Sequence, residues 1–266
     1  AAGILSDHEV FAHVDAMEKI RAGMTVELRG AFDWLLPLLV AELAALPEFP
    51  THVVAATDDL FALTLLEEGG IDDLLRRLIR YGMDPVRALR IATYNGAYRL
   101  QRPDLGMVAA GRRADVIVMS SLEDITVDDV FTDGRHVATG GSMIVPVIEG
   151  PARPPLDTIR ISSVGADDFR YRVPGVPDGR HRLRTVIGVV LTEWGEVEVE
   201  ITDGVVVVPE GRILNVVMHR HGRGDAPRAA GLLAGWGDWI GAIATTLSHD
   251  THNLSVFGRD PEDMAA

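Results

Sequence analysis

The sequence predicts an α/β fold in its first hundred residues, then a small β module, and then a C-terminal β-rich (α+β) domain. Short apolar runs alternate with helical spacing up to about residue 102, which is typical of parallel βα units. Beyond that point the pattern changes to strand-like runs separated by glycine-containing turns. A proline-bearing stretch, 146–155, precedes a further set of such runs. These changes predict domains at 1–102, 103–150 and 151–266.

The first domain is expected to consist of strands and helices in alternation. An apolar run ends at Asp7, and helical spacing follows over 9–22 until Gly23. A closed eight-stranded barrel needs about 250 residues, so these units account for only part of one. The later elements are expected to be a strand at 24–28, a helix at 31–46 with Pro37 in its first turns, a strand at 52–56, and helices at 71–81 and 86–100.

The rest of the chain is expected to be mainly strands. The β module has a strand at 115–119 and a hairpin over 130–137 that turns at Asp133 and Gly134. The strand-like runs of the C-terminal domain are 157–162, 185–191, 196–201 and 204–208.

The chain starts inside a predicted strand and ends at 263–266 without a closing element, so we expect a fragment of a longer enzyme.

Composition and charge exclude several classes of function. The 266 residues are 47% hydrophobic and 24% charged, with a formal net charge of −14 that disfavours nucleic acid and anionic membranes as partners. The chain has no cysteine, so any metal must be held by histidine and carboxylate. No apolar run approaches the ~18 residues of a membrane helix, and no signal peptide is visible. We therefore expect a cytoplasmic protein.

Polar side chains follow two of the predicted strands. The first apolar run leads into Asp7, His8 and Glu9, and the run that ends at residue 56 leads into Asp58 and Asp59. Functional groups of parallel barrels lie at the C-terminal ends of strands, so His8 and Asp58 are expected to face one cavity and to hold a metal. The alternative is that His8 is an ordinary polar residue at a strand end and that the aspartates cap a helix.

The short strand predicted at 24–28 lies between these two runs in the sequence, and Glu27 and Arg29 stand at its end. Arg29 could clamp a substrate or pair with an acidic group, and a plain salt bridge is the alternative. The sequence contains no glycine-rich phosphate loop, serine nucleophile elbow or His-Glu-x-x-His helix. Covalent catalysis therefore has little support.

A second polar cluster lies near the C-terminus. His249, Asp250 and His252 interrupt an otherwise apolar segment, where they could hold a metal or line a pocket. A polar surface loop is the alternative. His219 and His221 form a similar pair, since alternate residues of a strand share one face, and an exposed strand end is the alternative for them.

Several motifs occur together and in a fixed order along the chain. They are MTVELRG (24–30), TDDL (57–60), LLEEG (65–69), ATYNGA (92–97), DLG (104–106), GRRADVIV (111–118), HRHG (219–222) and SHDTHNL (248–254). In these motifs the sequence resembles the adenine deaminases of the amidohydrolase superfamily. The GRRADVIV segment is typical of amidohydrolases in general, whereas the last two motifs resemble adenine deaminases in particular.

The resemblance implies that residues 1–102 are the last strands and helices of a (β/α)8 amidohydrolase barrel. The small β module and an adenine-deaminase-type C-terminal domain would follow. The family binds divalent metal, and the resemblance implies two ions, with manganese or iron favoured and zinc also suitable. His8 would be the sixth-strand ligand, and Asp58 the eighth-strand ligand and proton carrier. From their positions in the sequence, we expect Glu27 and Arg29 to be further catalytic residues, and Asp59, His249, Asp250 and His252 to bind the substrate.

The implied activity is the hydrolytic deamination of adenine to hypoxanthine and ammonia in purine salvage, by a homodimer or higher homo-oligomer. The family's first-strand His-x-His pair, bridging acid and fifth-strand histidine would precede Ala1. The isolated chain is therefore expected to bind metal poorly and to be inactive. Two alternatives remain, namely another amidohydrolase such as a cyclic amidase or deacetylase, and a non-catalytic assembly module.

Overall fold

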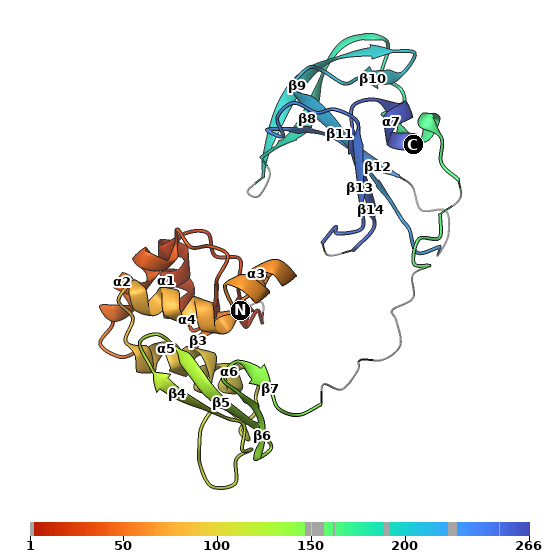
Figure 1. The fold of residues 1–266 in the computed structure, drawn as a ribbon. Coiled ribbons are helices and arrows are strands. Elements are labelled where there is room, and N and C mark those ends of the chain that lie inside the picture. Colours follow the sequence, from red (N-terminus) through yellow and green to blue (C-terminus); the bar gives the residue numbers. More distant parts are fainter. Residues whose placement is uncertain are drawn as a thin grey trace. The chain divides into compact units, whose positions relative to one another are not determined.

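The chain forms two compact units, residues 1–149 and 150–266 (Figure 1). The computed structural model describes residues 3–146, 150, 157–161, 163–188, 192–222, 228–249 and 251–266. Each unit has its own hydrophobic core. In these described residues no helix has both the length and the apolar character needed to cross a membrane.

A parallel sheet in the order β1-β2-β3 organises the first unit. Asp7 pairs with Val26, and Arg29 pairs with Ala56, so the C-terminal ends of the three strands meet at one edge. The predicted alternation of strands and helices is confirmed here. The elements are β1 (Ser6–Asp7), α1 (His13–Arg21), β2 (Thr25–Arg29), α2 (Leu36–Ala44) and β3 (Val53–Ala56).

The alternation of side chains along β2 sets what each face of the sheet presents. Val26 and Leu28 are 0% and 3% exposed and pack into the helical core, while Glu27 and Arg29 project from the opposite face. Pro37 lies in the first turn of α2, as predicted, where its missing N–H is not needed. Both α1 and α2 begin several residues later than the sequence suggests.

Two short helices follow β3. The first, α3 (Ala62–Glu67), was not expected from the sequence, and none of its residues is buried. The second, α4 (Ile71–Arg80), is the helix expected at 71–81. Its buried face consists of Leu74, Leu75 and Leu78, which have the spacing of one helical stripe.

The helix predicted over 86–100 is instead two helices, α5 (Pro85–Ala92) and α6 (Tyr94–Arg99). The backbone leaves helical geometry at Thr93, with φ −120° and ψ −86°. Just beyond the break, the buried Asn95 donates hydrogen bonds to the carbonyl oxygens of Pro50 at 3.1 Å and Val53 at 2.8 Å. A tertiary contact with the start of β3 therefore accompanies the break, which helical periodicity alone does not reveal.

A four-stranded antiparallel sheet in the order β4-β5-β6-β7 completes the first unit. Asp133 and Gly134 have φ values of 49° and 74°, which confirms the predicted tight hairpin turn. Ile125, 4% exposed, belongs to the same core as the helices. The predicted domain division at residue 102 stays a prediction. The strands are β4 (Val116–Ser121), β5 (Thr126–Thr132), β6 (Arg135–Thr139) and β7 (Ser142–Met143).

The second unit is built on a seven-stranded sheet in the order β10-β9-β8-β12-β11-β14-β13. Neighbouring strands run antiparallel except β8 and β12, which are parallel. Its elements are the 3-10 helix η1 (Ala166–Phe169), the strands β8 (Gly179–Ile187), β9 (Glu193–Thr202), β10 (Val205–Val207), β11 (Arg212–Met218), β12 (Ala229–Ala234), β13 (Ala242–Thr245) and β14 (Leu254–Gly258), and the helix α7 (Pro261–Ala265).

Some predictions for this unit are wrong. Residues 157–161 are not in a strand, and residue 162 lies outside the described residues. The strand predicted to begin at 185 begins at Gly179, and 189–191 lie outside the described residues. The helix α7 was not expected; Asp260 caps it and Met264 is buried in the core of the second unit. The strands expected at 196–201 and 204–208 are confirmed as β9 and β10.

Candidate metal centre

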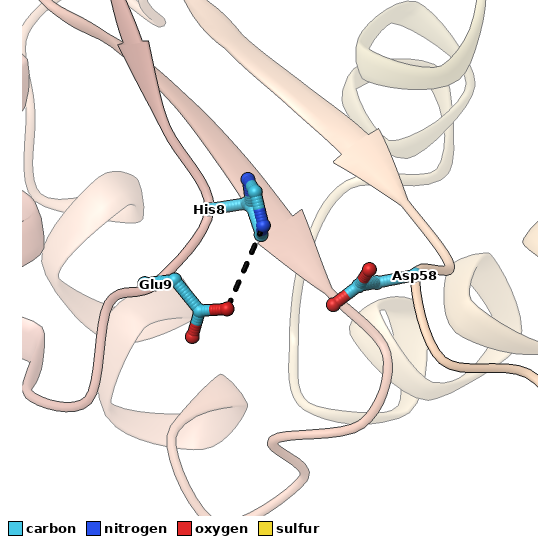
Figure 2. Close-up of side chains that lie close together, drawn as sticks. All are labelled: His8, Glu9 and Asp58. Atoms are coloured by element: carbon cyan, nitrogen blue, oxygen red, sulfur yellow. Dashed lines mark ion pairs between the residues drawn. The ribbon is translucent and has the colours of Figure 1, made fainter. Parts of the chain in front are cut away.

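The ends of the three parallel strands bring together one imidazole and two carboxylates. His8 and Glu9 directly follow β1, and Asp58 lies two residues beyond β3. One potential ligand atom from each of the three lies within 4.8 Å of the others. Figure 2 shows the three side chains turned toward a common space, with His8 Nε2 3.6 Å from Glu9 Oε1. The predicted meeting of His8 and Asp58 thus has a geometric basis, and Glu9 joins them.

These donor atoms suit a divalent ion. Imidazole nitrogen and carboxylate oxygen are ligands for zinc, iron and manganese, and no thiolate is required. All three side chains are exposed, so an ion could reach them. Among the residues that the structure describes, no other group of three or more histidines and acids lies this close together.

Asp58 adopts an unusual backbone conformation. Its φ of 54° lies in the left-handed region, which aspartate enters more readily than most residues. The turn follows directly on the end of β3, so it fixes where the carboxylate leaves the backbone.

Arg29, at the end of β2, is held between the acidic residues. Its side chain is only 6% exposed. Nη1 lies 2.8 Å from Glu9 Oε2, and Nη2 contacts both Asp58 Oδ2 and, at 3.3 Å, Asp59 Oδ2. The guanidinium also lies over the ring of Phe32, 4.4 Å from its centroid. Of the two roles that the sequence left open, the structure shows the pairing with acids.

Glu27 is placed behind His8. Its Oε2 lies 4.0 Å from His8 Nδ1, and its Oε1 lies 3.4 Å from Arg99 Nε. The side chain is 23% exposed. A carboxylate on the second nitrogen of a metal-binding histidine commonly fixes the orientation and tautomer of the ring.

Asp59 contacts Arg29 as its neighbour Asp58 does, and it also lines a cavity. Together with Gly30, Thr57 and Thr64 it lines a cavity of about 380 Å³ within the first unit. The cavity adjoins the ends of β2 and β3.

The sequence shows Glu9 in the polar run after the first apolar segment, but sequence reasoning assigned it no role. Consecutive residues of a strand point to opposite faces, but β1 ends at Asp7, so this rule does not separate His8 from Glu9. Asp7 itself turns away, and its Oδ2 lies 2.6 Å from Lys19 Nζ. This hydrogen bond from Lys19 holds the pKa of Asp7 below its usual value. The position at which the strand ends is the signal that could have identified Glu9 as part of the cluster.

The other predicted substrate-binding residues lie in the second unit. The rings of His249 and His252 are 5.3 Å apart in a T-shaped arrangement, between β13 and β14. The rings of His219 and His221 are similarly 5.4 Å apart, just after β11. Asp250 lies outside the described residues. A contact of His249, Asp250 and His252 with substrate therefore stays a prediction.

The comparisons with known proteins agree with this arrangement. Residues 40–137 match the amidohydrolase family. A parallel βα sheet with imidazole and carboxylates at its strand ends, in such a sequence, places the chain in the amidohydrolase family, which generally uses divalent metals. Residues 189–266 match the adenine deaminase C-terminal domain, and within its family the chain belongs with the adenine deaminases.

Similar sequences cover the whole chain. The chain is 49% identical over 266 residues to an adenine deaminase of Klebsiella pneumoniae subsp. pneumoniae, and 46% identical over 265 residues to adenine deaminase 2 of Agrobacterium fabrum. Each alignment covers 100% of this chain and 44% of the relative. The chain thus spans less than half the length of the curated relatives that it matches.

Solved structures resemble the chain only distantly. A β-aspartyl dipeptidase from Fervidobacterium islandicum AW-1 gives a TM-score of 0.40 at 18% identity, over 52% of this chain and 39% of that one. A triazine hydrolase variant gives 0.37 at 19% identity, over 55% of this chain and 38% of that one. At these scores the likeness carries no argument about this chain.

Proposed function

We propose that this chain forms part of the active site of a metal-dependent adenine deaminase, which hydrolyses adenine to hypoxanthine and ammonia. The observation that carries the proposal is the cluster of His8, Glu9 and Asp58 beyond the ends of β1 and β3, in a chain related over its whole length to adenine deaminases. Because the chain spans 44% of the first relative, the activity of a whole enzyme is part of the proposal. A cytoplasmic homo-oligomer acting in purine salvage is proposed on the resemblance alone.

His8 and Asp58 would hold a divalent ion, and Glu9 offers a third donor atom in reach of the same space. When bound, the metal would supply a nucleophile by lowering the pKa of a water ligand toward neutrality. Manganese, iron and zinc all accept this donor set. A second ion, which the resemblance implies, would need donors beyond these three residues.

Asp58 would act as the general base and the general acid of the reaction. Its carboxylate takes a proton from the attacking water as oxygen bonds to C6 of adenine, and it delivers a proton to the exocyclic nitrogen as the C6–N bond breaks. One water is consumed and one ammonia leaves, so the carboxylate is regenerated. Glu27 would keep the imidazole of His8 oriented through Nδ1. Asp59 would contact the substrate from the adjoining cavity.

The test needs a complete enzyme as well as the isolated chain. A suitable chimera replaces the matching segment of the Klebsiella pneumoniae adenine deaminase with this chain, which is 49% identical to it. Metal content and ammonia release from adenine are measured on the chimera and on the 266-residue chain. We expect the chimera to bind metal and to release ammonia.

Substitutions in the chimera then test the assigned roles. Asp58→Asn should lower kcat/KM for adenine by a factor of about 10²–10⁴, the usual contribution of a general acid or base. The matched control is Asp15→Asn, since Asp15 pairs with Lys19 on α1 and should leave turnover unchanged. A chimera that binds metal but leaves adenine intact would point to a different amidohydrolase activity. Full activity of Asp58→Asn would remove the proposed proton carrier.

A further inference from the structure

We propose that Arg29 is a positioning residue that links Glu9 to Asp58 and thereby fixes the carboxylate of Asp58 for proton transfer. This role rests on the proposed function, in which Asp58 carries the proton. Arg29 lies at the end of the central strand β2, between the ends of β1 and β3. Its two terminal nitrogens contact different acids, Nη1 that of Glu9 and Nη2 that of Asp58.

Burial and an aromatic contact hold the guanidinium of Arg29 in place in addition to its contacts with the acids. The side chain of Arg29 is 6% exposed, and its plane lies over Phe32. Phe32 is itself 6% exposed and packs against Phe11 and Trp34, with ring centroids 5.0 Å and 4.9 Å away. A buried arginine on an aromatic face has few alternative rotamers, so its nitrogens define fixed points for the acids.

The contacts leave a specific part of Asp58 available. Arg29 holds Oδ2, so Oδ1 is the oxygen that can take up or release a proton or meet a metal ion. Asp58 itself has a left-handed backbone conformation. The turn therefore fixes the start of its side chain, and the guanidinium of Arg29 fixes the carboxylate at the other end. Glu9 is tied to Arg29 at 2.8 Å and lies 3.6 Å from His8 Nε2. It therefore connects the arginine to the imidazole.

The negative charges of the neighbouring carboxylates favour a cation such as Arg29 between them. Three carboxylates, those of Glu9, Asp58 and Asp59, contact the guanidinium of Arg29 beside His8. Without Arg29 these acids would repel one another and turn toward solvent. Lysine could not replace it, because an ammonium is a point charge that cannot span two acids with separate planar nitrogens.

The test uses the chimera described above and measures kcat and KM for adenine. Arg29→Ala should lower kcat by a factor of about 10², the cost of a small misplacement of a reacting group, and should leave KM nearly unchanged. Guanidinium chloride added to Arg29→Ala should restore much of the lost kcat, since the free cation can occupy the vacated site. Arg29→Lys should remain impaired. Circular dichroism and metal content confirm that each variant is folded and loaded.

The matched control is Arg76→Ala. Arg76 pairs with Asp72 on the surface of α4, and its loss should change neither kcat nor the response to guanidinium. A rise in KM with unchanged kcat would overturn the proposal in favour of a substrate clamp. A loss of kcat that guanidinium does not restore in a folded, loaded protein would overturn it in favour of a structural salt bridge.

A result independent of adenine separates this proposal from the proposed function. If the unsubstituted chimera releases no ammonia, the proposed function fails, and Mn²⁺ affinity measured by electron paramagnetic resonance decides the role of Arg29. Guanidinium should then shift the Mn²⁺ affinity of Arg29→Ala by about fivefold or more, the lower end of coupling between sites, and leave Arg76→Ala unaffected. An equal response of both variants would overturn the positioning role.

Discussion

Asn95 offers the sharpest test of how the first unit is held together. The residue is 0% exposed, and its side-chain amide donates to the carbonyl oxygens of Pro50 and Val53. Asn95→Ala removes these two hydrogen bonds, together with the one that Arg90 Nε donates to Asn95 Oδ1 at 3.3 Å. It leaves two carbonyls without this donor, at about 1–3 kcal/mol each when buried. Pro50 is only half-buried, so the expected loss is about 2–4 kcal/mol.

This loss should be measured locally, because a chain of two compact units need not unfold in a single transition. The amides of β3 should exchange with deuterium about 30 to 700 times faster in Asn95→Ala, which corresponds to 1.4 kcal/mol for each factor of ten. Asn215→Ala, in β11 of the second unit, is the matched control and should leave β3 unchanged. Acceleration of less than about threefold would refute the assigned role of Asn95.

Two further predictions concern the same unit. Burial alone would raise the pKa of Asp33, but hydrogen bonds from Tyr81 and Arg77 outweigh it and hold that pKa below its usual value. The resulting stabilisation should be complete above the unfolded pKa of about 3.9 and lost as pH falls through the lower folded value. Asp7 and Asp72 also have lowered pKa values, so Asp33→Asn should weaken the dependence of the urea midpoint on pH without removing it. A pH dependence identical in both proteins would contradict this. Gly106→Ala should destabilise the unit by about 2 kcal/mol or more, because φ is 83° and the new Cβ would lie 2.7–3.0 Å from three atoms of α6 and its N-cap. Gly111→Ala, at φ 80° in open space, should cost only the backbone term of about 1 kcal/mol, so equal melting temperatures for the two variants would reject the steric argument.

The parallel strands of the first unit could be predicted because their signals are local. The strand β3 is a short apolar run, and β2 alternates apolar with polar residues between Gly23 and Gly30; both strands lie within a residue of their predicted limits. The break at Thr93 could not be predicted, since the sequence on either side keeps helical spacing and the bonds of Asn95 reach more than forty residues back. The helix α3 escaped prediction because its apolar residues are exposed and show no buried stripe.

The candidate site was predictable in part for the same reason. A polar residue after an apolar run is visible in the sequence, which placed His8 and Asp58 at the ends of two parallel strands. The contribution of Glu9 depends on where β1 stops, and a boundary error of one residue reverses the face to which a side chain points. The contacts of Arg29 with residues from both flanking segments depend on strand order, which a single sequence does not specify.

The left-handed turn at Asp58 restricts which residues this position can accept. Glycine, asparagine and aspartate enter that conformation at low cost, whereas glutamate and most other side chains do so with strain. Among those three, only aspartate carries a negative charge. Backbone geometry and charge thus select the same amino acid independently. Glutamate at this position would supply the negative charge but would be strained in the left-handed conformation. Asparagine would adopt that conformation easily but would carry no charge.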